Sequence, residues 1–234
     1  MIDKILSRSS CRSYKTKKVE ETKIKKLKQV INSSPTSVNA NQFSAIFVTD
    51  EKTKKELAEL NFGQLHVTQA PLIVVFVADY NRVMYCLKQN NIDAIEKTNN
   101  IQSLLIGTTD AVIAASYCSV AALELGLSTC FLGGIRRNIK QVCKILKLKG
   151  KSMPIIGLTV GYEDKITSVK PRINKVYDQE YDIKQVQDEL ITYEQVYKAY
   201  TKKTLGKEVG YFEAINKSFA NKMTNNNEIE EIRQ

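Results

Sequence analysis

The sequence is short of the side chains on which much enzyme chemistry depends. Its 234 residues include one histidine, His66, and no tryptophan. A metal site rich in histidine is therefore excluded, and a Ser-His-Asp or Cys-His mechanism has a single candidate base. The five cysteines are an odd number, and no two stand in a Cys-x-x-Cys spacing. A disulfide framework or a bound metal such as zinc is accordingly not expected.

Long hydrophobic runs are also missing. The longest, at residues 71–78, has the length of a buried strand and falls well short of the roughly 18 residues of a membrane span. Residues 1–8 lack the basic-then-apolar order of a signal peptide. We therefore expect a cytoplasmic protein that does not associate with a membrane.

Positive charge is abundant, but it is carried by lysine. The chain has 35 Lys and Arg against 25 Asp and Glu, a formal net charge of +10. The lysines are dispersed and are not interleaved with aromatic residues, which is typical of a solvated surface and not of a platform for stacked bases. A basic nucleic-acid-binding protein stays as a competing hypothesis, and it would bind DNA or RNA in a salt-dependent way.

Hydrophobic periodicity and turn residues predict an α+β fold: an α/β layout with one mixed sheet and helices on both faces. The run at 71–78 is typical of a strand covered on both sides. The expected strands are residues 45–48, 71–78, 128–132 and 154–160. The expected helices are residues 20–33, a segment capped by Asp50, and residues 100–125, 138–147 and 183–200, with a loop at 63–69. Residues 1–215 are expected to form a single domain, and 216–234 a polar tail.

Four segments offer hydrogen-bond donors or exposed backbone at the ends of these elements. They are residues 8–14, residues 33–42, residues 131–138 with their Gly-Gly pair, and the Lys-Pro-Arg of residues 170–172. Three of the four also hold five of the seven arginines, whose planar donor fork suits phosphate. Each segment alone is typical of an ordinary turn. A Walker loop and a Gly-x-Gly-x-x-Gly fingerprint are both missing, so ATPase chemistry and a Rossmann site have no support.

Taken in this order, the four segments resemble the nitroreductase family of FMN enzymes. Within it, they resemble the branch of major oxygen-insensitive NADPH nitroreductases and NADPH-flavin reductases. The resemblance covers about residues 1–215 and includes the stretches at 61–67, 75–79, 121–127 and 157–161. It implies FMN as cofactor, NADPH or NADH as electron donor, and a homodimer in which about residues 183–215 reach onto the partner subunit.

The resemblance also implies a flavin site. Arg12, Lys170 and Arg172 would hold the FMN phosphate and the pyrimidine edge of the flavin. The Gly-Gly pair would lay bare backbone against the ring, where a side chain would push it away. The implied cofactor-binding set is Arg8, Ser9, Ser10, Arg12, Thr36, Ser37, Asn39, Asn41, Gln64, Phe131, Leu132, Gly133, Gly134, Lys170 and Arg172. No catalytic side chain is expected, because the flavin N5 carries the hydride.

The sequence departs from the branch at three places. The first motif reads Arg8-Ser9-Ser10 where the branch has His-Arg-Ser, and Asn41 stands at the usual glutamine position. The segment at 202–207 has lysines in place of arginine. Arg136, Lys203 and Lys207 are the expected NADPH-binding residues. A lysine holds a 2′-phosphate as a point charge without the bidentate fork, which leaves the choice between NADPH and NADH open.

The implied activity is a ping-pong transfer of electron pairs from NADPH to small-molecule acceptors: nitro compounds, quinones or flavins. One alternative keeps the flavin but makes free reduced FMN the product, as in an NAD(P)H-flavin reductase. The nucleic-acid-binding hypothesis is the alternative from another class, and it predicts a colourless protein. His66 is expected to be a loop or packing residue, and Cys11, with an arginine beside it, is a candidate for a lowered thiol pKa.

Overall fold

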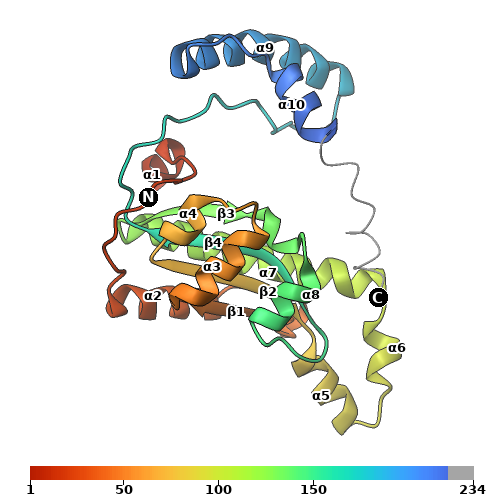
Figure 1. The fold of residues 1–234 in the computed structure, drawn as a ribbon. Helices are drawn as coiled ribbons and strands as arrows, with labels where there is room; N and C mark the ends of the chain where they lie inside the picture. Colours follow the sequence, from red (N-terminus) through yellow and green to blue (C-terminus); the bar gives the residue numbers. More distant parts are fainter. Residues whose placement is uncertain (221–234) are drawn as a thin grey trace. The chain divides into compact units, whose positions relative to one another are not determined.

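The computed structural model describes residues 1–220, which form two compact units, Met1–Thr167 and a second that begins at Ser168. Figure 1 traces both along the chain. The first unit is built on a four-stranded sheet in the order β1-β2-β4-β3. Its strands are β1 (Phe43–Val48), β2 (Leu72–Asp79), β3 (Ser128–Leu132) and β4 (Ser152–Gly161).

The central strand β2 confirms the expectation of a strand covered on both faces. Val74 and Phe76 point into one core and Val75 and Val77 into the other, and all four are fully buried. The α+β class is confirmed. The sheet, however, is antiparallel in each of the strand pairs within residues 1–220, where the sequence predicted a mixed one. A helical connection can return the chain in either direction, so sequence pattern alone does not determine strand direction.

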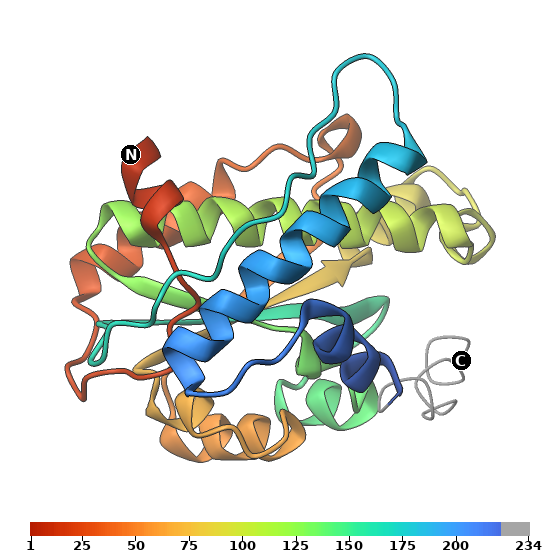
Figure 2. The same cartoon turned by 90° about the horizontal axis from the view of Figure 1, so that it is seen from above.

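Helices cover the two faces of this sheet, as Figure 2 shows. One face carries α2 (Glu21–Asn32) and α7 (Ile101–Glu124), whose apolar residues share a core with Val74 and Phe76. The other face carries α3 (Glu51–Leu60), α4 (Leu65–Gln69) and α8 (Ile139–Ile145), packed over Val75 and Val77. The first unit is therefore a three-layered structure whose strand ends and connecting turns remain accessible at the edges.

The 24-residue helix α7 is the central helix that its small side chains predict. Its N-terminus is capped by Asn100, whose Oδ1 accepts from the Ser103 N–H at 2.9 Å. A Cβ built on Gly107 would lie 3.0 Å from the Cβ of Ala78, so this glycine allows the helix to approach β2 closely. Helix α7 is long and apolar enough to cross a membrane by length and composition. Its packing against β2 and α2 accounts for that composition as the core helix of this unit.

Several short elements were not predicted from the sequence. They are α1 (Ile2–Ser7), α5 (Asn81–Gln89), α6 (Ala94–Thr98), the 3₁₀ turns η1 (Ser37–Asn39) and η2 (Gly133–Arg136), and α10 (Tyr211–Ala220). The expected loop at 63–69 is also wrong in part, because α4 occupies Leu65–Gln69. The shortest of these, such as the five-residue α6, show no hydrophobic period, and local caps and tertiary packing hold them.

The second unit consists of an extended segment followed by two helices, α9 (Ile183–Leu205) and α10. The buried Glu194 carboxylate on α9 accepts from the Phe212 N–H at 2.9 Å, and Thr201 Oγ1 bonds to the Val209 backbone. These contacts fasten α10 to α9 through the turn after Gly206, which ends α9 with a φ of 67°. Helix α10 continues to Ala220, past residue 215, and the rest of the expected tail lies outside the described residues.

Candidate flavin site

The first of the four segments lies along the outer edge of β3. The Cys11 N–H donates to the Thr129 carbonyl at 3.0 Å, and the Lys15 N–H donates to the Tyr162 carbonyl at 2.8 Å. The Cys11 and Tyr14 side chains are buried, whereas Arg12 is exposed. This anchoring presents the Arg12 side chain and the half-buried Arg8, Ser9 and Ser10 at the edge of the sheet.

Two arginines act on the surroundings of this segment electrostatically. Burial raises the pKa of the Cys130 thiol on β3, and the charges of Arg12 and Arg8 oppose that rise. Arg8 also donates to Ser10 Oγ at 3.3 Å. Burial likewise raises the pKa of Cys11, so the lowered pKa that its sequence neighbours suggested is not found. The cysteines here are inert packing residues, and the arginines form a cationic edge beside β3.

The turn that precedes α4 comes close to the same edge. Gln64 is exposed at the N-terminus of α4, and His66, two residues later, is 6% exposed. Burial lowers the pKa of His66, and the nearby charge of Arg12 lowers it further. The His66 Nε2 atom has no hydrogen-bond partner in the described residues. The structure thus places the Arg12 charge within electrostatic range of His66 on α4, although the two residues are far apart in the chain.

We expect His66 to make stability fall at acidic pH. The unfolded chain binds a proton near pH 6.5, whereas the folded chain resists protonation because burial and Arg12 lower the pKa of His66. More protons are bound in the unfolded state, so the free energy of unfolding should drop by up to about 1.4 kcal/mol per pH unit just below pH 6.5. Urea unfolding at pH 7.5 and 5.5 should show this loss in the natural protein and a smaller one in His66→Gln. Equal losses in both proteins would contradict the assignment.

The Gly-Gly pair follows β3 directly and opens η2, and its two glycines differ. A Cβ on Gly133 would meet nothing closer than Arg136 Nη2 at 3.9 Å, so this backbone is bare and accessible. A Cβ on Gly134 would lie 2.6 Å from Oδ1 of the buried Asn61. Packing within the protein therefore requires a glycine at position 134. At position 133 the protein has room for a side chain, and the backbone is exposed. Before the pair, Leu132 is buried and Phe131 is 38% exposed.

The second segment lies at the opposite edge of the sheet. It leads into β1, and β1 and β3 are the two edge strands. Val38, Asn39 and Asn41 have φ angles of 46°, 54° and 54°, a conformation that is strained for a β-branched valine. Val38 is 91% exposed, and Asn41 Nδ2 donates to the Asn39 carbonyl at 2.7 Å. Within one chain, Thr36, Ser37, Asn39 and Asn41 thus do not share an edge with Arg12 and Gly133.

Asp110 holds the second segment in place and was not predicted from the sequence. It lies in the middle of α7, is 2% exposed, and its Oδ1 accepts from the Ser37 N–H at 3.1 Å. Burial raises the pKa of Asp110, while the backbone N–H groups of Ser37 and Gln42 oppose that rise. The available signal was a lone carboxylate within the otherwise uncharged stretch of residues 101–123.

Replacing Asp110 with alanine should loosen this segment and destabilise the fold. The partly buried Ser37 N–H would lose its acceptor, which costs about 1 kcal/mol. Asp110→Asn keeps an oxygen at the same place and should cost less. Denaturant unfolding of both variants measures the difference, and proteolysis at residues 36–41 should be faster in the alanine variant. If the two variants were equally stable, the Ser37 hydrogen bond would not be what the carboxylate contributes.

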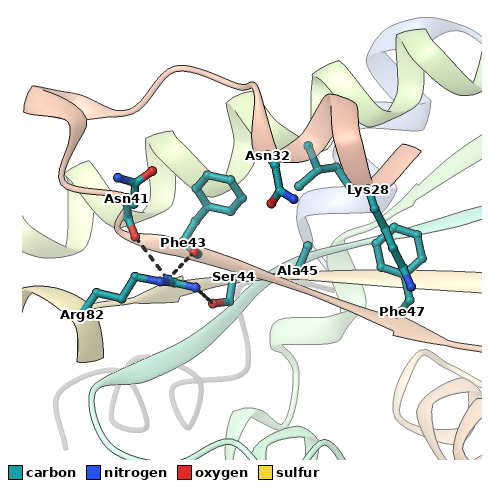
Figure 3. Close-up of a pocket in the computed structure, with 9 residues that line it drawn as sticks. Lys28, Asn32, Asn41, Phe43, Ser44, Ala45, Phe47 and Arg82 are labelled. Carbon is teal, nitrogen blue, oxygen red and sulfur yellow. Dashed lines mark hydrogen bonds between the residues drawn. The ribbon is translucent and has the colours of Figure 1, made fainter. Parts of the chain in front are cut away.

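A hollow of about 590 Å³ lies beside β1 and not at the Gly-Gly edge. Figure 3 shows Lys28, Phe43 and Phe47 around it, with Arg82 below. Arg82 Nη1 donates to the carbonyls of Asn41 and Phe43 at 3.3 and 2.9 Å. The guanidinium is thereby used to fasten the end of the second segment to the start of β1. The hollow supports that segment and shares only Asn41 with the expected flavin-binding residues.

The remaining expected site residues belong to the second unit. Lys170 and Arg172 are exposed in its extended segment, and Tyr193 on α9 fixes the residue between them by donating to the Pro171 carbonyl at 2.7 Å. Lys203 is exposed in the last turn of α9, and Lys207 follows the left-handed Gly206. Arg136, in the first unit, donates to the Ile155 carbonyl at 2.6 Å through Nη1. The three expected NADPH-binding residues are thus divided between the two units.

Comparisons with known proteins agree with this fold and assign the chain to a family. Residues 5–162 match the nitroreductase family. The FMN reductase [NAD(P)H] of Bacillus subtilis is 32% identical over 213 residues, which cover 89% of this chain and 86% of the relative. The structure of NfrA1 from B. megaterium superposes with a TM-score of 0.92 at 28% identity, covering 99% of this chain and 97% of that one. The structure of the NADPH:FMN oxidoreductase from Vibrio harveyi complexed with NAD+ superposes with a TM-score of 0.80 at 26% identity. The superposition covers 94% of this chain and 90% of that one. The chain belongs to the nitroreductase family.

Proposed function

We propose that this protein is an NAD(P)H-dependent flavin oxidoreductase that binds FMN and passes electron pairs from NADPH or NADH to small-molecule acceptors. The observation that carries the proposal is the edge of β3, where the charges of Arg12 and Arg8 act on Cys130 and the bare backbone of Gly133 follows the end of the same strand. FMN, when bound, supplies two-electron chemistry that no side chain of this protein offers. The protein then needs only to bind and orient the cofactor and the substrates and to exclude water. This accounts for an enzyme with a single histidine.

The residues at this edge fit the two ends of FMN. Arg8, Ser10 and Arg12 offer guanidinium and hydroxyl donors to a phosphate, the anion for which arginine is best suited. Gly133 offers backbone without a Cβ, so a flat ring can approach it closely. Gln64, exposed at the N-terminus of α4, offers an amide that can hydrogen-bond the edge of such a ring. The fixed charge of Arg12 would also favour the added negative charge of the reduced cofactor.

The place of the second segment supports a homodimer. Thr36, Ser37, Asn39 and Asn41 lie beside β1, across the sheet from Arg12 and Gly133. A flavin between two subunits would use the β3 edge of one chain and the β1 edge of the other. About residues 183–215 would reach onto the partner subunit, and sedimentation of the purified protein tests the dimer. We further propose that the protein acts in the cytoplasm.

For the electron donor we propose Arg136, Lys203 and Lys207 as contacts. Arg136 keeps its Nη2 beside Gly133 while Nη1 is bonded to the Ile155 carbonyl. The lysines would attract the donor's phosphates as point charges. Because donor and acceptor would use the same open face in turn, we expect ping-pong kinetics, with parallel lines in double-reciprocal plots. Intersecting lines would favour separate sites.

We propose that Lys170 and Arg172 also bind FMN. Each single alanine variant should retain the fold and release FMN more readily, because each loses one charged hydrogen-bond donor. Dialysis against buffer, followed by absorbance at the flavin band, measures retention. Lys175→Ala, which removes an exposed cation a few positions further on, serves as the control. Unchanged FMN affinity in both test variants would refute this part of the site.

The visible spectrum of the purified protein, with identification of the flavin released on heating, tests the function directly. A yellow protein that releases FMN and oxidises NADPH in the presence of a nitroarene or quinone is expected. Steady-state rates with free FMN and with a nitroarene separate the proposed oxidoreductase from a flavin reductase that supplies reduced FMN to a partner. A colourless protein that takes up no added FMN would refute the proposal, and salt-sensitive binding of DNA or RNA would then favour the nucleic-acid hypothesis.

A further inference from the structure

An exposed aromatic ring stands beside the Gly-Gly turn with an arginine stacked on it. The Arg137 guanidinium carbon lies 4.0 Å from the centre of the Phe62 ring. Phe62 is 60% exposed although it is a large apolar side chain. Such a stacked pair gains a modest stabilisation, yet it leaves the edge of the guanidinium and much of the ring facing solvent.

The backbone around this pair is strained, and specific contacts hold it in place. Phe62 has a φ of 63° and is followed by Gly63 at 61°, so two consecutive residues adopt the left-handed conformation that a phenylalanine disfavours. The buried Asn61 anchors the turn, because its Nδ2 donates to the Leu57 carbonyl at 2.8 Å. A Cβ on Gly134 would lie 3.4 Å from Phe62 Cε2, which shows how closely the ring approaches η2. The protein thus holds an exposed ring in a strained position beside the proposed flavin edge.

The donors of Arg137 are not engaged by an acidic side chain in the part of the chain that the structure describes. No carboxylate within residues 1–220 forms an ion pair with it. Its neighbour Arg136, by contrast, donates to the Ile155 carbonyl. The guanidinium edge of Arg137 can therefore meet an anion while its face stays on the Phe62 ring.

We propose that Phe62 and Arg137 together form a specificity-determining platform for the electron acceptor, and that they favour a planar aromatic acceptor carrying an anionic group. The exposed part of the Phe62 ring would stack on the acceptor, and the edge of the Arg137 guanidinium, whose face stays on that ring, would bind the acceptor's carboxylate or phosphate. The inference rests on the proposed function, since it concerns the substrate class of the same site. It assigns the pair to the acceptor and not to NADPH.

The test compares 4-nitrobenzoate with 4-nitrobenzamide, which differ mainly in charge. With FMN-saturated protein, the ratio of their kcat/KM values should fall about fivefold in Arg137→Gln, as for loss of one exposed charged contact. Phe62→Asn, which suits the left-handed backbone, should lower kcat/KM for both nitroarenes without loss of stability. Lys144→Gln removes an exposed cation on α8 and should leave the ratio unchanged. Equilibrium dialysis of 4-nitrobenzoate should show the same about fivefold loss of affinity in Arg137→Gln.

The outcomes separate the two proposals. If the natural protein reduces both nitroarenes but Arg137→Gln leaves their ratio and the 4-nitrobenzoate affinity unchanged, the platform is refuted while the oxidoreductase stands. If Arg137→Gln instead changes the preference for NADPH over NADH and leaves the acceptor ratio intact, the pair serves the donor and the assignment is wrong. A natural protein that binds no FMN and reduces neither compound overturns both proposals.

Discussion

Replacing Gly133 with leucine should strongly weaken FMN binding while leaving the flavin-free fold intact. A Cβ at this position meets nothing closer than Arg136 Nη2 at 3.9 Å, so the protein itself has room for a side chain. The proposed flavin ring would collide with that side chain. We therefore expect the affinity of the protein for FMN to fall on the order of 100-fold through steric exclusion. Fluorescence titration of the flavin-free protein with FMN measures the affinity, and thermal unfolding of that protein measures the fold.

The adjacent Gly134 provides a matched control, because its replacement should lower the stability of the flavin-free protein. A Cβ on Gly134 would lie 2.6 Å from Oδ1 of Asn61, which is buried and bonded to the Leu57 carbonyl. Gly134→Ala should therefore destabilise the flavin-free protein by about 1–3 kcal/mol. If Gly133→Leu bound FMN as tightly as the natural protein, the flavin would not lie on this backbone, and the proposed site would have to move.

The Arg12→Ala variant should show the second large effect. Arg12 is exposed at the edge of β3 and is proposed to hold the FMN phosphate, so its loss should raise the FMN dissociation constant about 10- to 100-fold. Lys15→Ala, three positions further along the same segment, removes a cation whose backbone hydrogen bond to Tyr162 stays in place, and it should change the affinity little. An equal loss in both variants would point to a general effect of charge.

The same variant has a readout that needs no cofactor. The charge of Arg12 lowers the pKa of His66, so its removal should raise that pKa in the flavin-free protein. His66 is the only histidine, which makes its imidazole signal in a proton NMR titration unambiguous. A pKa that stayed the same would mean that Arg12 is not held beside α4. The geometry assigned to the cationic edge would then be wrong, whatever the FMN affinity.

Much of the fold was predictable because its strongest elements carry local patterns. The apolar run at 71–78 became the doubly covered strand β2, and the small side chains of 100–125 became the core helix α7. Short helices such as α4 escaped prediction, since five residues show no period and their burial comes from other parts of the chain. Strand direction escaped for the same reason, because neighbouring strands pair across long separations in sequence.

The site divides along the same line. The sequence by itself determined the four segments, their order and the family to which they belong, since each is a local run of donors, glycines or arginines. Only the tertiary structure placed residues 36–41 at the edge opposite Gly133, and put Asp110 behind Ser37 across 73 positions of chain. The tertiary structure also distinguished the accessible Gly133 from Gly134, where Asn61 leaves no room for a side chain. It placed Arg137 on the Phe62 ring as well. These are contacts between residues distant in the chain, which packing decides and local pattern does not encode.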